Sequence, residues 1–402
     1  MKKLIQNLSI MFISLIATLA VCEVGARLLL PPPMSVQAVT VTKRTFSEEP
    51  TKEVTSDDGS IFNLINWHKS AERGVRLHPN VTATLSSHTL SKQPVTLRIN
   101  SYGMRGPQLG PKEPGEFRIL NIGDSITFGD YLEEALTIPA LLEKRLAPHT
   151  TKVVVLNAGL PGANAADEYY HYLELQEAVK PDLVFLGMYL NDAQESGKFY
   201  AKQLRFPFSK SRFLTWFVQR FQLIDSDKLF GGFKATSPDE GWRDSFRNAR
   251  DLKPGNMYGT RDGFDFEIYN AHKDFGLAWN PEGWAQLNKI VGTWVQVAHK
   301  NNQQFAAYLF PVKMQIFASD TALSTYPQES FMKMCKEFNI PCLDLLPLIR
   351  AEVKAKNIRD SDLLYDHCHY KAPGNEIVAE KLTEWMVSSK LLTPYTPAGK
   401  TS

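Results

Sequence analysis

Short runs of apolar and β-branched residues recur along this chain, and most of them end in a motif of small or polar residues. Continuous apolar runs of roughly four to eight residues are typical of strands buried on both faces of a parallel sheet. Helices are expected between and after these runs, notably over residues 282–300 and 373–391. This alternation predicts an α/β fold, a flavodoxin-like three-layer α/β/α sandwich with a parallel sheet. The expected strands cover residues 117–122, 152–156, 183–189, 305–311 and 341–345.

The most informative motif, Gly123-Asp124-Ser125, directly follows the first of these runs. A serine that leaves a buried strand on a tight turn lies where both a substrate and a base can reach its hydroxyl. Gly-Asp-Ser also occurs in ordinary turns. The motif therefore gains its weight from the residues that follow downstream.

A base and an acid stand near the far end of the chain, in the segment that contains Asp366 and His369. A serine hydroxyl is a poor nucleophile until an imidazole accepts its proton, and a carboxylate must hold that imidazole in the right tautomer. The spacing of three would place both side chains on the same side of a helical turn. The alternative is a plain polar loop before a last helix that begins at Pro373. His367 immediately follows Asp366 and is expected to point elsewhere.

Two further motifs follow the second and third expected strands. The first contains Gly162, and the second contains Asn191. Ligands of open α/β sheets bind outside the carboxyl ends of the strands, so all of these motifs should converge on one crevice. Acyl transfer needs hydrogen-bond donors aimed at the oxyanion of the tetrahedral intermediate. The amides of Ser125 and Gly162 and the side chain of Asn191 are suitable donors.

Together the four blocks resemble those of the GDSL, or SGNH, hydrolases, which are named for a serine, a glycine, an asparagine and a histidine. The resemblance runs from about residue 117 to 392, interrupted by an insertion over residues 193–280. It departs from the family pattern before Asn191. The family usually has a glycine next to or near this asparagine, whereas here Met188, Tyr189 and Leu190 precede it, which predicts a narrower crevice.

The resemblance implies a role for each site residue. Ser125 would be the nucleophile, His369 the general base and Asp366 the acid that orients the base. The amides of Ser125 and Gly162 and the side chain of Asn191 would form the oxyanion hole. No cofactor is implied.

Charge and ligand spacing argue against several other classes of protein. The 402 residues include 45 basic and 43 acidic side chains, a net charge of +2, so nothing favours a nucleic-acid partner. His367, Cys368 and His369 offer only adjacent ligands, and no second cluster in the sequence would complete a tetrahedral metal site. We therefore expect no bound metal.

The N-terminus predicts where the protein is located. Lys2 and Lys3 precede an apolar stretch that extends to Leu30, and basic residues at the start favour a cytoplasmic N-terminus with the rest exported. An uncleaved signal-anchor over residues 1–30 fits best. A cleaved signal peptide and a lipoprotein modified at Cys22 are the alternatives. All three place the catalytic domain outside the cytoplasmic membrane of a bacterial envelope.

Several regions flank or interrupt the predicted hydrolase domain of residues 117–392. Residues 31–60 have the composition of a linker, residues 61–116 are expected to form a small β-rich module, and residues 393–402 form a tail. Arg105, in the module, is interpreted as a structural anchor rather than a substrate contact. Phe213 and Phe217 recur at helical spacing within the insertion, as expected of a cap helix, a lid over an acyl chain or a helix at the membrane surface.

Four cysteines do not make a disulfide scaffold in a chain of this length. Cys22 belongs to the membrane segment, so at most one pair can form among Cys335, Cys342 and Cys368. Cys335 and Cys342 could bridge, but their spacing alone does not decide it.

The sequence thus predicts a serine ester hydrolase that acts on an acyl ester of a small molecule, a polysaccharide or a lipid. Three rivals remain. An O-acyltransferase would use the same Ser125, a polysaccharide-binding or assembly protein would retain an inactive triad, and a flavodoxin-like redox protein would bind a phosphate group in the loop at 123–129.

Overall fold

The fold is described from a computed structural model of the chain. The described residues are 2–29, 52–56, 76–86, 91–193, 211, 213–214, 217, 276–279, 281–317 and 325–393. Most of the predicted insertion over 193–280 therefore lies outside the described residues, as do residues 30–51, residues 57–75 and the tail from 394 onward.

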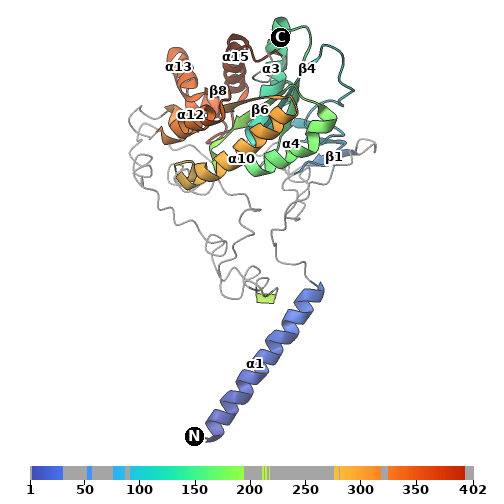
Figure 1. The fold of residues 1–402 in the computed structure, drawn as a ribbon, viewed down its shortest axis with the longest axis vertical. Coiled ribbons are helices and arrows are strands. Elements are labelled where there is room, and N and C mark those ends of the chain that lie inside the picture. The colour runs from blue at the N-terminus through green and yellow to red at the C-terminus, as the bar shows by residue number, and fades with distance from the viewer. Residues whose placement is uncertain are drawn as a thin grey trace. The chain divides into compact units, whose positions relative to one another are not determined.

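A five-stranded parallel sheet forms the centre of the larger unit, in the order β5-β4-β6-β7-β8 (Figure 1). The strand of this sheet that comes first in the chain, β4, therefore lies inside the sheet, which is the flavodoxin-like order expected from the sequence. Side chains of β4 and β6 are buried along their whole length, as continuous apolar runs require. The strands are β4 (Phe117–Gly123), β5 (Val153–Gly159), β6 (Leu183–Met188), β7 (Gln304–Leu309) and β8 (Cys342–Asp344).

Helices cover both faces of this sheet and complete the three-layer sandwich (Figure 1). One layer contains α4 (Ala165–Val179), α10 (Pro281–Lys300) and α12 (Tyr326–Phe338), with α10 in contact with the other two. The other layer contains α3 (Ile138–Leu146), α13 (Leu346–Lys356) and α15 (Ala372–Ser388), with α15 in contact with the other two. The short helices are α2 (Ser125–Phe128), α11 (Lys313–Phe317) and α14 (Asp360–Leu363).

Apolar periodicity explains how these helices pack. In α10 the buried side chains recur every three or four residues, so one face of the helix lies against the sheet. Trp294 of this face is fully buried and its ring contacts Phe305 of β7, with centroids 5.5 Å apart. The rigid core holds the strand ends in place, and those ends carry the candidate site.

A smaller sheet precedes the first strand of the sandwich. It contains β1 (Lys52–Ser56), β2 (Val81–Leu85) and β3 (Val95–Ile99), with β2 antiparallel to β3 and parallel to β1. Its hydrophobic core includes Phe128, Leu160 and Ala163 of the sandwich, so the two sheets share buried apolar surface. One difference from the sequence analysis concerns β1, which lies in the segment interpreted as a linker. Its polar residues give no apolar alternation, yet its backbone pairs with β2.

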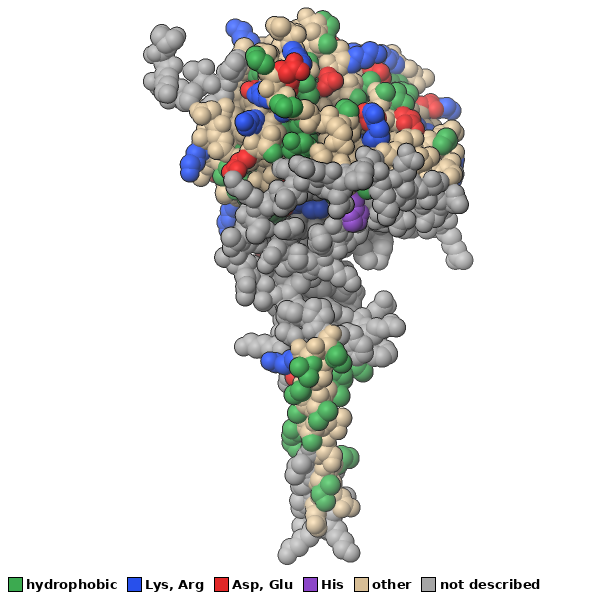
Figure 2. Space-filling model, turned by 90° about the vertical axis from the view of Figure 1, so that its right-hand side faces the viewer, with side chains coloured by type: hydrophobic (Ala, Val, Ile, Leu, Met, Phe, Trp, Pro, Cys, Tyr) green, Lys and Arg blue, Asp and Glu red, His purple; other side chains and the backbone are tan. Residues whose placement is uncertain are grey.

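The N-terminal helix α1 spans Lys2–Leu29. Residues 10–29 have a mean hydropathy of 1.9 and are long and apolar enough to cross a membrane, a property that signal sequences share. Figure 2 shows apolar side chains along its exposed surface. Near its C-terminal end the Glu23 carboxylate accepts hydrogen bonds from the Ser211 hydroxyl at 2.6 Å and the Phe213 amide at 3.1 Å. Phe213 also contacts Phe217, so this predicted aromatic face begins beside α1.

A disulfide joins Cys335 of α12 to Cys342 at the start of β8, with the Cα atoms 6.2 Å apart. This is the pairing that the spacing permitted without deciding. Cys22 and Cys368 are free thiols.

Candidate active site

The register of the parallel sheet brings three predicted motifs to one edge. Gly123, the last residue of β4, is opposite Gly159 of β5 on one side and Gly187 of β6 on the other. The chain segments that carry Ser125, Gly162 and Asn191 leave the sheet within a few residues of this row. These three segments therefore leave the sheet at the same edge, where the crevice is expected.

Ser125 is the first residue of α2, a single helical turn that begins directly after β4. The carboxylate of Asp124 caps this turn by accepting the Ile126 amide at 2.9 Å. The turn ends at Gly129, whose φ of 80° is in the left-handed region that favours glycine. The backbone from Gly123 to Gly129 thus fixes the direction of the Ser125 hydroxyl from both sides.

Asp366 and His369 lie in the loop between α14 and α15 rather than on a helix. The structure has no helical turn here. A β-bridge between Leu364 and Tyr370 instead closes the loop as a tight, hairpin-like turn. The Asp366 side chain provides the local order instead. Its Oδ1 accepts the amides of Cys368 at 3.0 Å and of His369 at 2.8 Å.

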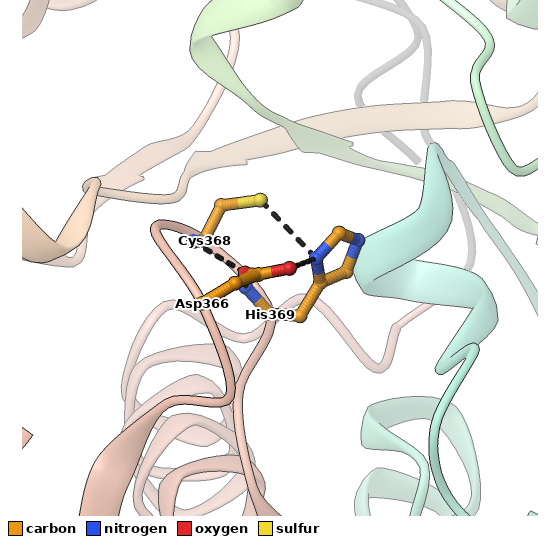
Figure 3. A group of neighbouring side chains, drawn as sticks. All are labelled: Asp366, Cys368 and His369. Atoms are coloured by element: carbon orange, nitrogen blue, oxygen red, sulfur yellow. Dashed lines mark hydrogen bonds and ion pairs between the residues drawn. The ribbon is translucent and has the colours of Figure 1, made fainter. Parts of the chain in front are cut away.

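A chain of hydrogen bonds joins the three candidate catalytic side chains. His369 Nδ1 lies 2.7 Å from Asp366 Oδ2, and His369 Nε2 lies 2.8 Å from Ser125 Oγ (Figure 3 shows Asp366 and His369). A carboxylate can only accept, so the neutral imidazole donates its Nδ1 proton to Asp366. The Nε2 lone pair then faces the Ser125 hydroxyl, which is the tautomer a general base needs.

The electrostatics of the pair favour a charged imidazole. Burial alone would raise the pKa of the Asp366 carboxyl, but the charge and hydrogen bond of His369 hold that pKa well below its usual range. Burial alone would lower the pKa of His369, but the neighbouring Asp366 carboxylate raises it well above 6.5. An imidazolium formed after proton transfer from Ser125 is therefore stabilised where it forms.

The proposed oxyanion donors are arranged at the adjoining strand ends. Gly162 has a φ of 72° in the turn after β5, a conformation that L side chains rarely adopt. Asn191 is in the single turn of residues 190–193 after β6, and the buried Asp192 pins that turn by accepting the Tyr189 amide at 2.9 Å. The hydrogen bonds of the described residues join Ser125, His369 and Asp366. Gly162 and Asn191 are placed near them by strand register, and their role stays a prediction.

The bulky residues before Asn191 do not narrow the crevice as their size suggested. Met188, Tyr189 and Leu190 are at most 2 % exposed and belong to the hydrophobic core. Their side chains fill the sandwich rather than the site.

Two residues at this site have no signal in the sequence. Tyr131 and Asp130 follow α2 and line a small cleft together with Ser125 and His369. The Tyr131 ring packs edge-on against the His369 ring with centroids 4.7 Å apart, and burial raises the pKa of Asp130 to about 7. Arg105 is buried and donates to backbone carbonyls, which agrees with the interpretation of it as an anchor.

The one group of described residues whose ligand atoms could hold a metal ion is Asp366, Cys368 and His369, with these atoms within 4.8 Å of one another (Figure 3). Its Asp366 and His369 atoms are the ones engaged with each other in the hydrogen-bond chain. A metal ion would take His369 Nδ1 away from Asp366, so this geometry fits a base and its orienting acid better than a ligand set.

Comparison with known families agrees with this geometry. Residues 119–210, which include Ser125, Gly162 and Asn191, match the family model described as GDSL-like lipase/acylhydrolase. The match assigns this part of the chain to the GDSL/SGNH hydrolase family. The protein is accordingly an ester-bond hydrolase, and its parallel sheet and covering helices are those of the SGNH hydrolase fold. No curated protein matches the sequence.

Several solved structures are similar to this GDSL hydrolase at low identity. An acetylxylan esterase from Geobacillus stearothermophilus is 15 % identical, with 67 % of this chain and 94 % of that chain covered and a TM-score of 0.37. An α/β hydrolase from the metagenome of Lake Arreo is 12 % identical, with 69 % and 96 % covered and a TM-score of 0.40. A G-D-S-L family protein from Veillonella parvula is 13 % identical, with 67 % and 97 % covered and a TM-score of 0.37. At these TM-scores the likeness does not bear on the substrate of this chain.

Proposed function

We propose that this GDSL hydrolase is an acyl or acetyl esterase in which Ser125 attacks the ester carbonyl. His369 accepts the Ser125 proton and passes it to the leaving alcohol, while Asp366 orients the imidazole. A water molecule activated by His369 then releases the acyl group from Ser125. The hydrogen-bond chain from Ser125 Oγ through His369 to Asp366 carries this proposal.

The oxyanion that forms in each step needs donors in place beforehand. In the proposal these are the amides of Ser125 and Gly162 and the side chain of Asn191. Removal of one such donor typically costs about a hundredfold or more in kcat. Asn191→Ala should therefore lower kcat by at least this factor.

We further propose that the enzyme acts outside the cytoplasmic membrane, anchored through α1, on O-acylated polysaccharide or on lipid-like esters. Two observations support this location: the apolar length of residues 10–29, and a disulfide between Cys335 and Cys342, a bond typical of oxidising compartments. Protease added to intact spheroplasts should digest the catalytic domain if it faces outward. Complete protection there, with digestion after lysis, would place it in the cytoplasm.

The decisive experiment is turnover of p-nitrophenyl acetate by the wild type, Ser125→Ala and His369→Ala. Each substitution should abolish turnover while the circular dichroism spectrum stays unchanged, because the three-layer core does not depend on either side chain. Ser361→Ala on the exposed helix α14 is the matched control. Wild-type rates in Ser125→Ala or His369→Ala would refute the assignment.

A different measurement tests each alternative function. A fluorophosphonate should label the wild type at Ser125, whereas an assembly protein with an inactive triad would stay unlabelled. Product analysis with an added glycan acceptor distinguishes hydrolysis from acyl transfer. Acyl transfer faster than hydrolysis would make the enzyme an O-acyltransferase.

A further inference from the structure

The loop after α2 is held by a residue from the smaller sheet. Arg105 follows β3, is 3 % exposed, and donates from Nη1 to the carbonyl oxygens of Phe128 at 2.9 Å and Gly129 at 2.6 Å. Its Nη2 donates to the carbonyl oxygen of Leu132. The guanidinium also lies over the Phe128 ring, 5.0 Å from its centroid. One side chain therefore fixes both ends of residues 129–132.

The position of Arg105 is itself set by the sandwich. Its amide donates to the Asn157 carbonyl of β5 at 3.0 Å, and Phe128 belongs to the core of the smaller sheet. Burial lowers the pKa of Arg105 to about 10, so the guanidinium is still charged at neutral pH. Loss of the side chain would leave three backbone carbonyls without a charged donor.

The loop that Arg105 holds presents Tyr131 to both partners of the nucleophile. The Tyr131 and His369 rings meet edge-on, with 66° between their planes, and the Tyr131 hydroxyl is 3.5 Å from Asp366 Oδ2. That oxygen is the one that accepts from His369 Nδ1. Tyr365 packs edge-on against the other part of the Tyr131 ring, with centroids 5.4 Å apart, which limits where this ring can go.

We propose that Arg105 and Tyr131 are positioning residues for the general base. Arg105 fixes the loop of residues 129–132, and Tyr131 from that loop sets the orientation of the His369 imidazole toward Ser125 Oγ. The smaller sheet then contributes to the active site indirectly, through Arg105 in the segment that follows β3. This inference rests on the proposed function of Ser125 and His369.

Tyr131→Leu is the first test, made in the full-length chain in detergent. Removal of the ring should lower kcat for p-nitrophenyl acetate by about tenfold to a hundredfold, the usual cost of a misplaced catalytic group, with KM within twofold. Tyr131→Phe keeps the ring and should restore kcat to within about threefold of the wild type. The long 3.5 Å contact of the hydroxyl predicts that the ring contributes most.

Arg105→Met tests the connection between the smaller sheet and the base. It should lower kcat like Tyr131→Leu, and the double variant should be no slower than the slower single variant, because Arg105 acts through Tyr131. Arg98→Ala is the matched control. Arg98 belongs to β3 of the same sheet and pairs with Glu134 at 2.7 Å, but its side chain is half exposed and its ion-pair partner lies outside residues 129–132. This control should keep wild-type kcat.

The outcomes separate this inference from the proposed function. Wild-type kcat in a folded Tyr131→Leu variant would overturn the role of Tyr131. If the losses of kcat in the two single variants multiply in the double variant, the link to Arg105 is overturned. If Arg105→Met does not fold, the comparison of Tyr131→Leu with Tyr131→Phe decides the matter, since equal losses in both would also overturn the role of the ring. Turnover that persists in Ser125→Ala would refute the proposed function instead.

Discussion

The Asp366 carboxylate determines at which pH the proposed base can work. Because this carboxylate raises the pKa of His369 well above 6.5, the imidazole gives up its proton at a higher pH than an ordinary histidine does. A protonated Nε2 cannot accept the Ser125 proton. Turnover should therefore rise with pH through the raised pKa of His369 and level off above it.

Asp366→Asn should shift this profile. Loss of the negative charge lowers the pKa of His369, so the acid limb of kcat/KM moves to lower pH. The rate should also fall by about 10⁴-fold because the tautomer is no longer fixed. A pH–rate profile of both proteins between pH 5 and 10 checks this, with Ser125→Ala as the background. An acid limb that stays in place would mean that another group titrates.

Asp130 should make the stability of the protein depend on pH. Burial raises the pKa of Asp130 to about 7, against the opposing charges of His369 and Arg105, whereas its ordinary value is 3.8. Between these values the unfolded chain loses the proton and the folded chain keeps it. The contribution of Asp130 to stability therefore falls as the pH rises from about 4 to 7, by at most about 1.4 kcal/mol per pH unit.

Asp130→Asn removes this titration. The melting temperature of the variant relative to the wild type should be higher at pH 8 than at pH 5, as measured by thermal unfolding of both proteins at both values. The same difference at pH 5 and pH 8 would show that Asp130 does not titrate in this range.

The turn α2 can lie against β5 only because Gly159 has no side chain. A Cβ at this position would lie 2.2 Å from the Phe128 amide nitrogen and 2.6 Å from the Phe128 Cα. Gly159→Ala should therefore push α2 away from the sheet, destabilise the fold by about 1–3 kcal/mol and displace Ser125 from His369. Denaturant unfolding and kcat test both effects.

Gly110→Ala is the control for this substitution, because a Cβ at Gly110 meets nothing within 4 Å. Its free energy of unfolding should stay within about 0.5 kcal/mol of the wild type. Equal stability of the two alanine variants would mean that α2 adjusts without cost.

The elements that the sequence predicts best are those with long apolar runs. The strand expected at 305–311 is β7 at Gln304–Leu309, and the last helix expected at 373–391 is α15 at Ala372–Ser388. Helix α12 (Tyr326–Phe338) has Pro327 in its first turn, so its start gives no apolar pattern. The short polar strand β1 gives no such pattern and is detectable only through its pairing with β2.

The residues of the candidate site also differ in whether a local sequence pattern reveals them. Ser125, Gly162, Asn191, Asp366 and His369 each belong to a local motif and so could be named from the sequence. Tyr131 and Arg105 act through contacts that only the folded chain creates. Arg105 reaches carbonyl groups 23 to 27 residues away, and Tyr131 reaches Asp366 across 235 residues. No spacing rule predicts such pairs.

The disulfide concerns the stability of the whole protein rather than its chemistry. It joins two residues that are seven positions apart, one in α12 and one in β8. In the sheet, β8 and β5 are the strands at opposite edges. A double Cys335→Ala, Cys342→Ala variant should lose about 2 kcal/mol of stability, the usual effect of a short loop closure. The kcat should be unchanged, and addition of a reductant to the wild type should reproduce the lower melting temperature. A fall in kcat without unfolding would tie the bond to the site.

The nucleophile and its proposed base are 244 residues apart in the chain. A polypeptide made from its N-terminus carries the serine long before the histidine is synthesised. In the export proposed above, the pair would assemble only after both residues have crossed the membrane. Activity would then report that this part of the chain has been exported.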